Sequence, residues 1–174
     1  NINILSIVVN FVDILGHSRS ESEVLKELIP NESAYRNAIY NWFENSWLYD
    51  CFKEFSNWNA EILLTSDHGN VKVSKPAAVK ADNMTSKGVR YKYGRNLNVD
   101  SKKAYKIRNP EKFLLPKLDV NTEYIIAKDS SYFVYSNKYH KYVNIYKDSF
   151  QHGGISMDEI IVPLINLKSK NEES

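Results

Sequence analysis

Three of the four histidines in this chain have an aspartate or glycines nearby, at spacings that suit metal binding. His17 follows Asp13 by four residues, His68 directly follows Asp67 in TSDHGN, and His152 opens a His-Gly-Gly sequence. Each motif alone has an ordinary alternative, because Asp-His pairs often cap helices and His-Gly-Gly often forms a turn. Mixed Asp and His ligands suit zinc, and manganese or iron less specifically. Together the three motifs predict a metal site.

The apolar segments before these motifs predict the strands that position them. Residues 2–12 are rich in β-branched side chains and predict a strand buried on both faces, which leads into a turn containing Asp13 and His17. If that turn is helical, both side chains point to one side. The next strand, over residues 58–67, ends at the Asp-His pair. Because parallel sheets bind ligands at the carboxyl ends of their strands, we expect the motifs to converge at one edge.

Helices are predicted between these strands. Ser20 and Glu23 have capping-box spacing and predict a short helix that ends at Pro30. Aromatic and aliphatic residues then recur at helical spacing over residues 31–55, as one helix or as two broken near Asn45. This apolar stripe is predicted to pack in the core. The order strand, helix, strand favours an α/β fold with a parallel sheet.

The predicted organisation is a single domain with an insertion. Residues 1–70 and 151–167 are assigned to the core, 71–150 to a β-rich insertion, and 168–174 to a disordered tail. The runs TEYIIAK, SYFVYS and YVNIY in the insertion have β propensity. Near the end of the core, Ser156 to Glu159 predict a short capped turn and residues 160–167 a last buried strand.

Positive charge is concentrated between Val71 and Lys112, where 12 Lys and Arg face 3 Asp and Glu. Such a block favours an anionic partner, although solvated Lys-rich loops are an ordinary alternative. Within it, RYKYGRN interleaves cations with tyrosines, a pattern that suits a nucleotide and is equally typical of an edge strand. The candidates for substrate binding are Arg90, Lys92, Arg95 and, beside His17, Arg19.

The cysteine content, the hydropathy and the first residues of the chain indicate its compartment and its partners. The single cysteine, Cys51, excludes an internal disulfide and fits a reducing, cytoplasmic compartment. No apolar run approaches the roughly 20 residues of a membrane helix, so we expect no membrane partner. The chain opens without Met inside a predicted central strand, which predicts a piece of a longer protein. Strand edges exposed in such a piece favour self-association as a homodimer.

The blocks VNFVDILGHSR, LLTSDHGN and FQHGGISMDEIIVPL resemble the PglZ domain, a branch of the alkaline phosphatase superfamily. The likeness is closest to the PglZ domain of PorX-type response regulators and spans Ile2 to Leu167. It is strong in the three blocks and loose over 71–150. The resemblance implies part of an alkaline-phosphatase-like parallel sheet with flanking helices and a β-rich basic insertion.

The resemblance also implies two zinc ions. Asp13, His17 and His152 match the ligands of one ion, and Asp67 and His68 match two ligands of the other. A further aspartate and the nucleophilic Ser or Thr match nothing in this chain and are expected upstream, so no catalytic residue is assigned here. The piece alone is therefore expected to be inactive, with partial or no zinc.

The implied function of the intact protein is zinc-dependent hydrolysis of a phosphoester, as a phosphodiesterase or phosphatase. Its substrate is expected to be a nucleotide or another anionic phosphoester, and its upstream partner a receiver domain in the same chain. The alternative from another class is a signalling module that keeps the ligands for structure and has little turnover. A mononuclear or non-zinc site is a third alternative.

Overall fold

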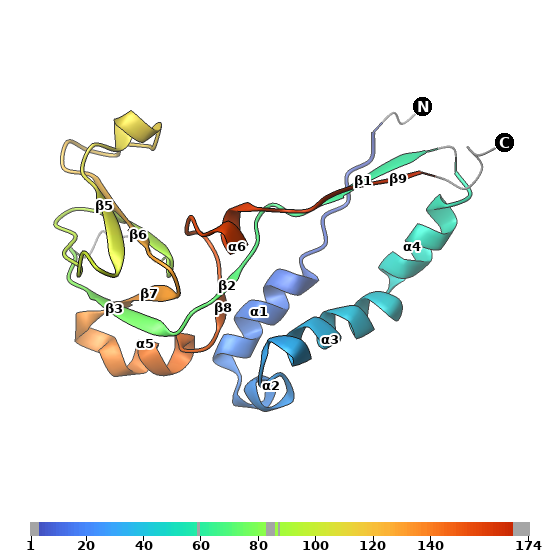
Figure 1. The fold of residues 1–174 in the computed structure, drawn as a ribbon, viewed down its shortest axis with the longest axis horizontal. Helices are drawn as coiled ribbons and strands as arrows, with labels where there is room; N and C mark the ends of the chain where they lie inside the picture. The colour runs from blue at the N-terminus through green and yellow to red at the C-terminus, as the bar shows by residue number, and fades with distance from the viewer. Residues whose placement is uncertain (1–3, 59, 83–85, 87, 169–174) are drawn as a thin grey trace. The chain divides into compact units, whose positions relative to one another are not determined.

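The computed structural model describes residues 4–58, 60–82, 86 and 88–168, which form two compact units (Figure 1). The first unit comprises residues up to Leu63 and from Asn166, and the second runs from Leu64 to Ile165. The boundary falls inside strands β1 (Glu61–Thr65) and β9 (Leu164–Lys168). With mixed helices and small sheets, one of them a parallel pair, the protein has an α/β fold, as predicted.

The helices described in the first unit match a predicted start signal only at Asn31. They are α1 (Phe11–Glu21), α2 (Glu23–Leu28), α3 (Glu32–Glu44) and α4 (Trp47–Phe55). The Asn31 side chain accepts a hydrogen bond from Ala34 N at 2.9 Å and caps α3, and the break after Glu44 confirms two helices. The predicted cap at Ser20 is wrong: Ser20 lies inside α1 and bonds Gly16 O, while Ser22 caps α2.

The predicted first strand is also absent from residues 4–10, all of which the structure describes. This segment is extended, and Ile4, Leu5 and Val8 are 88%, 63% and 79% exposed. β-branched residues favour extended backbone, but a strand also needs a neighbour that satisfies its N–H and C=O groups. α1 begins directly after this segment, so Asp13 and His17 lie on a helix.

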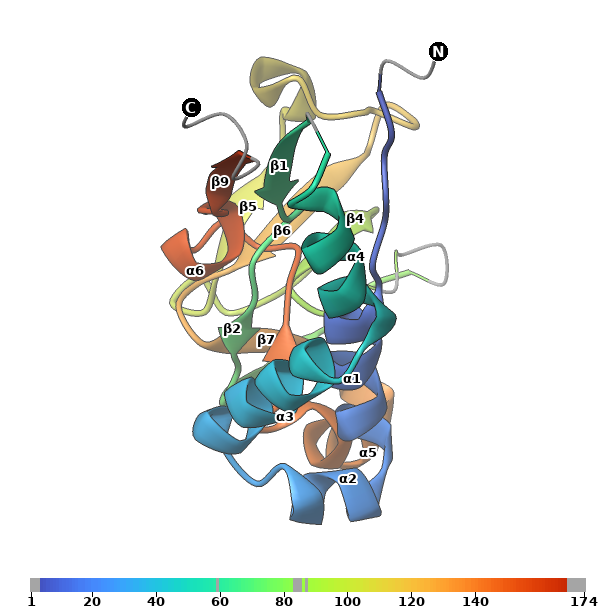
Figure 2. The same ribbon diagram turned by 90° about the vertical axis from the view of Figure 1, so that its right-hand side faces the viewer.

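Side-chain contacts join α1 to α3, which lie side by side (Figures 1 and 2). The rings of Phe11 and Trp42 stack with centroids 4.1 Å apart, and the Tyr35 hydroxyl donates to Val12 O at 2.9 Å. Of the predicted apolar stripe, Tyr35 is buried, whereas Trp42 is half-buried and Trp47 is 54% exposed. The stripe therefore faces a core in this unit only in part.

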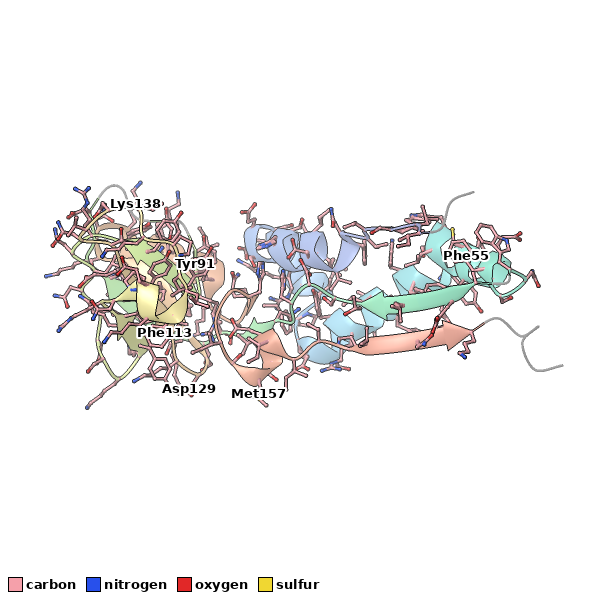
Figure 3. The ribbon with its side chains drawn as sticks, turned by 90° about the horizontal axis from the view of Figure 1, so that it is seen from above. Phe55, Tyr91, Phe113, Asp129, Lys138 and Met157 are labelled. Carbon is pink, nitrogen blue, oxygen red and sulfur yellow. The ribbon has the colours of Figure 1, made fainter. Side chains whose placement is uncertain are left out.

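Strands β1 and β9 pair with each other, and their arrows run in opposite directions (Figure 3). Thr65 Oγ1 donates to Pro163 O at 2.8 Å, and Asn166 donates to the Glu61 carboxylate. The predicted last strand, over residues 160–167, is confirmed from Leu164 onward, but residues 160–163 lie outside it and every residue of β9 is exposed. The parallel pairing predicted for the β1 region occurs elsewhere, in the second unit.

The second unit is built on three small sheets. In the first sheet, β3 (Lys75–Val79) pairs in parallel with β7 (Ser131–Tyr135). In the second, β6 (Glu123–Ala127) lies between β4 (Tyr91–Gly94) and β5 (Ala104–Ile107) and is antiparallel to both. In the third, β2 (Val71–Lys72) pairs antiparallel with β8 (Phe150–Gln151). The helical segments are η1 (Pro110–Phe113), η2 (Ser136–Lys138), α5 (Tyr139–Tyr146) and α6 (Met157–Ile160). Two predicted strands, TEYIIAK and SYFVYS, are confirmed as β6 and β7.

Apolar side chains of the strands form the core of this unit. One cluster comprises Ala77, Val79, Leu97, Ala104, Ile125, Ala127 and Phe133. A second, of Val73, Tyr132 and Val134, packs against α5. The prediction of a strand at YVNIY is wrong, because Tyr142, Val143 and Tyr146 recur at helical spacing and bury one helix face on this cluster.

No helix among the residues that the structure describes is both long and apolar enough to span a bilayer.

Candidate metal centre

The first pair of candidate ligands lies on α1. Asp13 and His17 are one helical turn apart, with His17 Nε2 3.3 Å from Asp13 Oδ1 and both side chains about half exposed. Ligands about 2.0–2.1 Å from a tetrahedral zinc ion are about 3.3–3.4 Å from each other. The observed spacing is that of an ion pair and equally that of two ligands on one ion.

The second pair follows β1 in the second unit. His68 Nε2 lies 3.6 Å from Asp67 Oδ2, and the other carboxylate oxygen accepts from His68 N at 3.0 Å. His68 Nδ1 lies 2.9 Å from Gly69 O. Because a carbonyl oxygen only accepts, this contact places the ring proton on Nδ1 and leaves Nε2 as the electron-pair donor. A metal-binding histidine is commonly oriented in this way.

His152 joins the second pair through the register of β2 and β8. Val71 is opposite Gln151 in this antiparallel ladder, so residues just before β2 lie beside residues just after β8. The His68 and His152 rings accordingly stack, with centroids 3.9 Å apart and planes at 11°. Two of the three candidate histidines therefore form one face-to-face pair within the second unit.

Glu159, on α6, connects the two loops that carry these histidines. Its buried carboxylate accepts from Arg90 Nε and Nη2 at 2.8 Å each, from Gly154 N at 2.8 Å, and from Ser156 N and Oγ at 3.1 and 2.7 Å. Its main-chain oxygen accepts from Gly69 N at 2.8 Å. One residue thus fixes the chain just after His68 and just after His152.

Two glycines allow this close approach. A Cβ on Gly69 would lie 2.1 Å from the main-chain oxygen of Asp158, and one on Gly154 would lie 2.7 Å from Glu159 Oε2. Gly153 has a φ of +95°, a conformation that side chains disfavour. The His-Gly-Gly and Asp-His-Gly sequences therefore need their glycines for the packing of both loops on α6.

With this geometry established, comparison with known families identifies the chain. The family described as the BREX system PglZ alkaline phosphatase-like domain matches residues 2–167. The chain belongs to the PglZ family. No curated protein matches it. Membership places this PglZ chain among the alkaline phosphatase-like domains, a class of phosphoester hydrolases that usually depend on metal ions.

The structure gives the four predicted substrate-binding cations of this PglZ chain different surroundings. Arg90 is fully buried against Glu159 and also donates to Ser131 O. Arg19 is 5% exposed and donates to Ile29 O at 2.6 Å, at the end of α2. These contacts argue against substrate binding by either arginine and give both a structural role.

The other two cations also differ in exposure. Lys92 is 1% exposed, and its ammonium donates to Ser86 O at 3.2 Å and lies 4.3 Å from the centre of the Tyr135 ring. Burial lowers the pKa of Lys92 to about 8. Arg95 is 54% exposed and pairs with Asp119 at 2.8 Å. Of the four cations, Arg95 is the one whose exposure allows contact with a substrate.

Sequence reasoning missed the Arg90–Glu159 pair in this PglZ chain. The capping box that predicted the turn is present, because Glu159 is the third residue of α6 and bonds Ser156. That local signal does not reveal a partner 69 residues away.

Glu159 is expected to make the stability of the second unit depend on acid pH. Burial alone would raise the pKa of its carboxyl, but hydrogen bonds from Arg90, Ser156 and Gly154 outweigh it and lower the pKa to about 2, from 4.5. Its contribution is thus complete above pH 4.5 and lost as the pH falls toward 2, by at most about 3 kcal/mol.

Urea denaturation of wild type and Glu159→Gln between pH 7 and pH 2.5 measures this effect. The difference in unfolding free energy between the two proteins should shrink steadily below pH 4.5. A difference that stays constant over this range would contradict the low pKa.

Proposed function

We propose that this PglZ domain is a zinc-dependent phosphoester hydrolase acting on a nucleotide or another anionic phosphoester. The observation that carries the proposal is the spacing of two Asp–His pairs, with donor atoms 3.3 and 3.6 Å apart. Carboxylate oxygen and imidazole nitrogen are zinc ligands, and both spacings are near the edge of a tetrahedral zinc site, about 3.3 Å.

From the family resemblance we assign Asp13, His17 and His152 to one zinc ion and Asp67 and His68 to a second. The donor chemistry fits, because the Gly69 carbonyl holds the proton of His68 on Nδ1 and leaves Nε2 available. Bound divalent ions would supply positive charge for the phosphoryl oxygens and acidify an attacking hydroxyl.

The protein's own residues would hold and orient these groups. Glu159 keeps the loops of His68 and His152 in place, which limits the reorganisation needed on binding. Arg95 is exposed enough to contact an anionic substrate. From the resemblance alone, we also propose that the nucleophile and one further ligand lie outside this chain, in a response regulator with a receiver domain.

Zinc binding by the purified chain tests the ligand assignment directly. We expect His17→Ala to weaken one site and His68→Ala the other, each by about 100-fold or more, because removing a ligand costs more than the 10–100-fold typical of its supporting partners. His140→Ala is the matched control, since His140 is exposed on α5 and belongs to no candidate pair. Calorimetric titration with zinc, with elemental analysis of the bound ion, gives affinity and stoichiometry. Equal zinc binding by wild type and both site variants would refute the assignment.

Activity separates the hydrolase from the alternative signalling module. The full-length protein should hydrolyse a chromogenic phosphodiester only when zinc is present, and a chelator should abolish the rate. Zinc binding without any turnover by the full-length protein would favour the module. The chain by itself is expected to show no turnover, with partial or no zinc.

A further inference from the structure

The second unit contains a pocket of about 420 Å³ that shares no residue with the candidate metal centre. It is lined by residues 79–82, residues 135–138 and Tyr142. The volume is within the range of small-molecule sites, about 300–1,000 Å³. Its lining is polar, with lysine, serine and asparagine side chains beside two tyrosines.

The pocket lies at the carboxyl ends of the parallel strands. β3 and β7 pair in register up to Val79 and Tyr135, so the segments that follow both strands emerge at the same edge. Ligands of α/β proteins bind outside the carboxyl ends of parallel strands. The walls are tied together, because Ser136 Oγ donates to Val79 O at 3.2 Å and Lys80 exchanges two main-chain hydrogen bonds with Asn98.

The charges of the lining favour an anion. Lys80 and Lys138 both line the pocket, and no ion pair joins either lysine to a carboxylate among the residues that the structure describes. Lys138 lies at the surface of the unit (Figure 3). The one acidic residue of the lining, Asp82, accepts a hydrogen bond from Asn96 at 3.0 Å. Two lysine ammonium groups at the same pocket attract a phosphate group.

The tyrosines give the pocket a rigid aromatic wall. The Tyr135 and Tyr142 rings meet edge to face at 6.2 Å, and Tyr142 stacks on Tyr146 with planes at 3°. The ammonium of Lys92 lies 4.3 Å from the centre of the Tyr135 ring and, being 1% exposed, supports that ring from the interior. Rings held in this way are preformed for contact with another aromatic group.

We propose that this pocket binds a phosphate monoester of a flat aromatic group, of the size of a nucleoside monophosphate. Lys80 and Lys138 bind the phosphate, and the Tyr135–Tyr142 wall contacts the ring. The site is separate from the proposed hydrolytic centre, because none of its residues is a candidate ligand. It stands whether or not the chain binds zinc.

Calorimetric titration of the whole chain with adenosine monophosphate tests the proposal, with a chelator present so that the candidate metal centre holds no ion. The charge-reversed variant Lys80→Glu/Lys138→Glu should lose at least about tenfold in affinity, equivalent to about 1.4 kcal/mol. The control Lys75→Glu/Lys147→Glu changes the net charge equally at exposed lysines outside the pocket and should bind as wild type does. Circular dichroism and thermal unfolding verify that both variants fold.

Titration with two further ligands tests the phosphate contacts and the aromatic contacts of the pocket separately. Adenosine and inorganic phosphate should each bind more weakly than adenosine monophosphate. Equal affinity for inorganic phosphate and the nucleotide would overturn the role of the aromatic wall. Equal loss in both double variants, or no binding by wild type, would overturn the site.

Discussion

Glu159→Gln is expected to destabilise the second unit by about 3–5 kcal/mol at neutral pH, the usual cost of leaving one member of a buried ion pair without its partner. The Arg90 guanidinium is fully buried, and both of its hydrogen bonds to Glu159 are 2.8 Å long. Glutamine keeps the shape of the side chain but removes the charge and one acceptor. The midpoint and slope of urea denaturation measure the loss.

Asp158→Asn is the matched control, because it makes the same chemical change at the neighbouring, exposed residue. It should alter the unfolding free energy by less than about 0.5 kcal/mol. A double-mutant cycle sharpens the test: Arg90→Met should cost much less in the Glu159→Gln background than in wild type. Equal costs in both backgrounds would show that the two side chains do not stabilise each other.

Gly69→Ala is expected to destabilise the second unit by about 2–4 kcal/mol, from steric overlap and from loss of a hydrogen bond. The new Cβ would lie 2.1 Å from Asp158 O, a main-chain atom that moves only if α6 moves. Moving α6 away breaks the bond from Gly69 N to Glu159 O. The same displacement should separate the His68 and His152 rings, which proton NMR of the imidazole signals detects.

Gly16→Ala is the control for this substitution. Gly16 lies inside α1, and its added Cβ would approach the Tyr35 hydroxyl at 3.2 Å. Alanine is favoured over glycine in a helix by about 1 kcal/mol, so the change should be neutral or mildly stabilising. If Gly69→Ala and Gly16→Ala had equal effects, the close contact with α6 would be unimportant.

Local signals in the sequence predicted several elements correctly. Asn31 caps α3 and Ser156 caps α6 because a capping side chain bonds an amide two or three residues away. Likewise, the four-residue spacing of Asp13 and His17 places both side chains on the same face of a helix. These features depend on a few consecutive residues, which is why the sequence alone reveals them.

Apart from the cap placed at Ser20 instead of Ser22, the errors concern features that depend on distant partners. β-branched residues 4–9 form no strand because pairing, and not propensity alone, makes a strand. YVNIY has β propensity yet forms α5, since its helical face fits the cluster of Val73, Tyr132 and Val134. Arg90 resembled a surface cation until the fold placed it beside Glu159. Tertiary packing decided each of these cases.

The short β2–β8 ladder has a consequence for how this family can vary. Because Lys72 and Phe150 are paired neighbours, the chain between them leaves and returns at the same point. A segment that leaves and returns at one point can be lengthened, shortened or exchanged during evolution without moving His68 and His152. Arg90 limits that freedom, because it belongs to the exchangeable segment yet neutralises Glu159. A shortened variant that lacks Arg90 must therefore supply another cation beside Glu159.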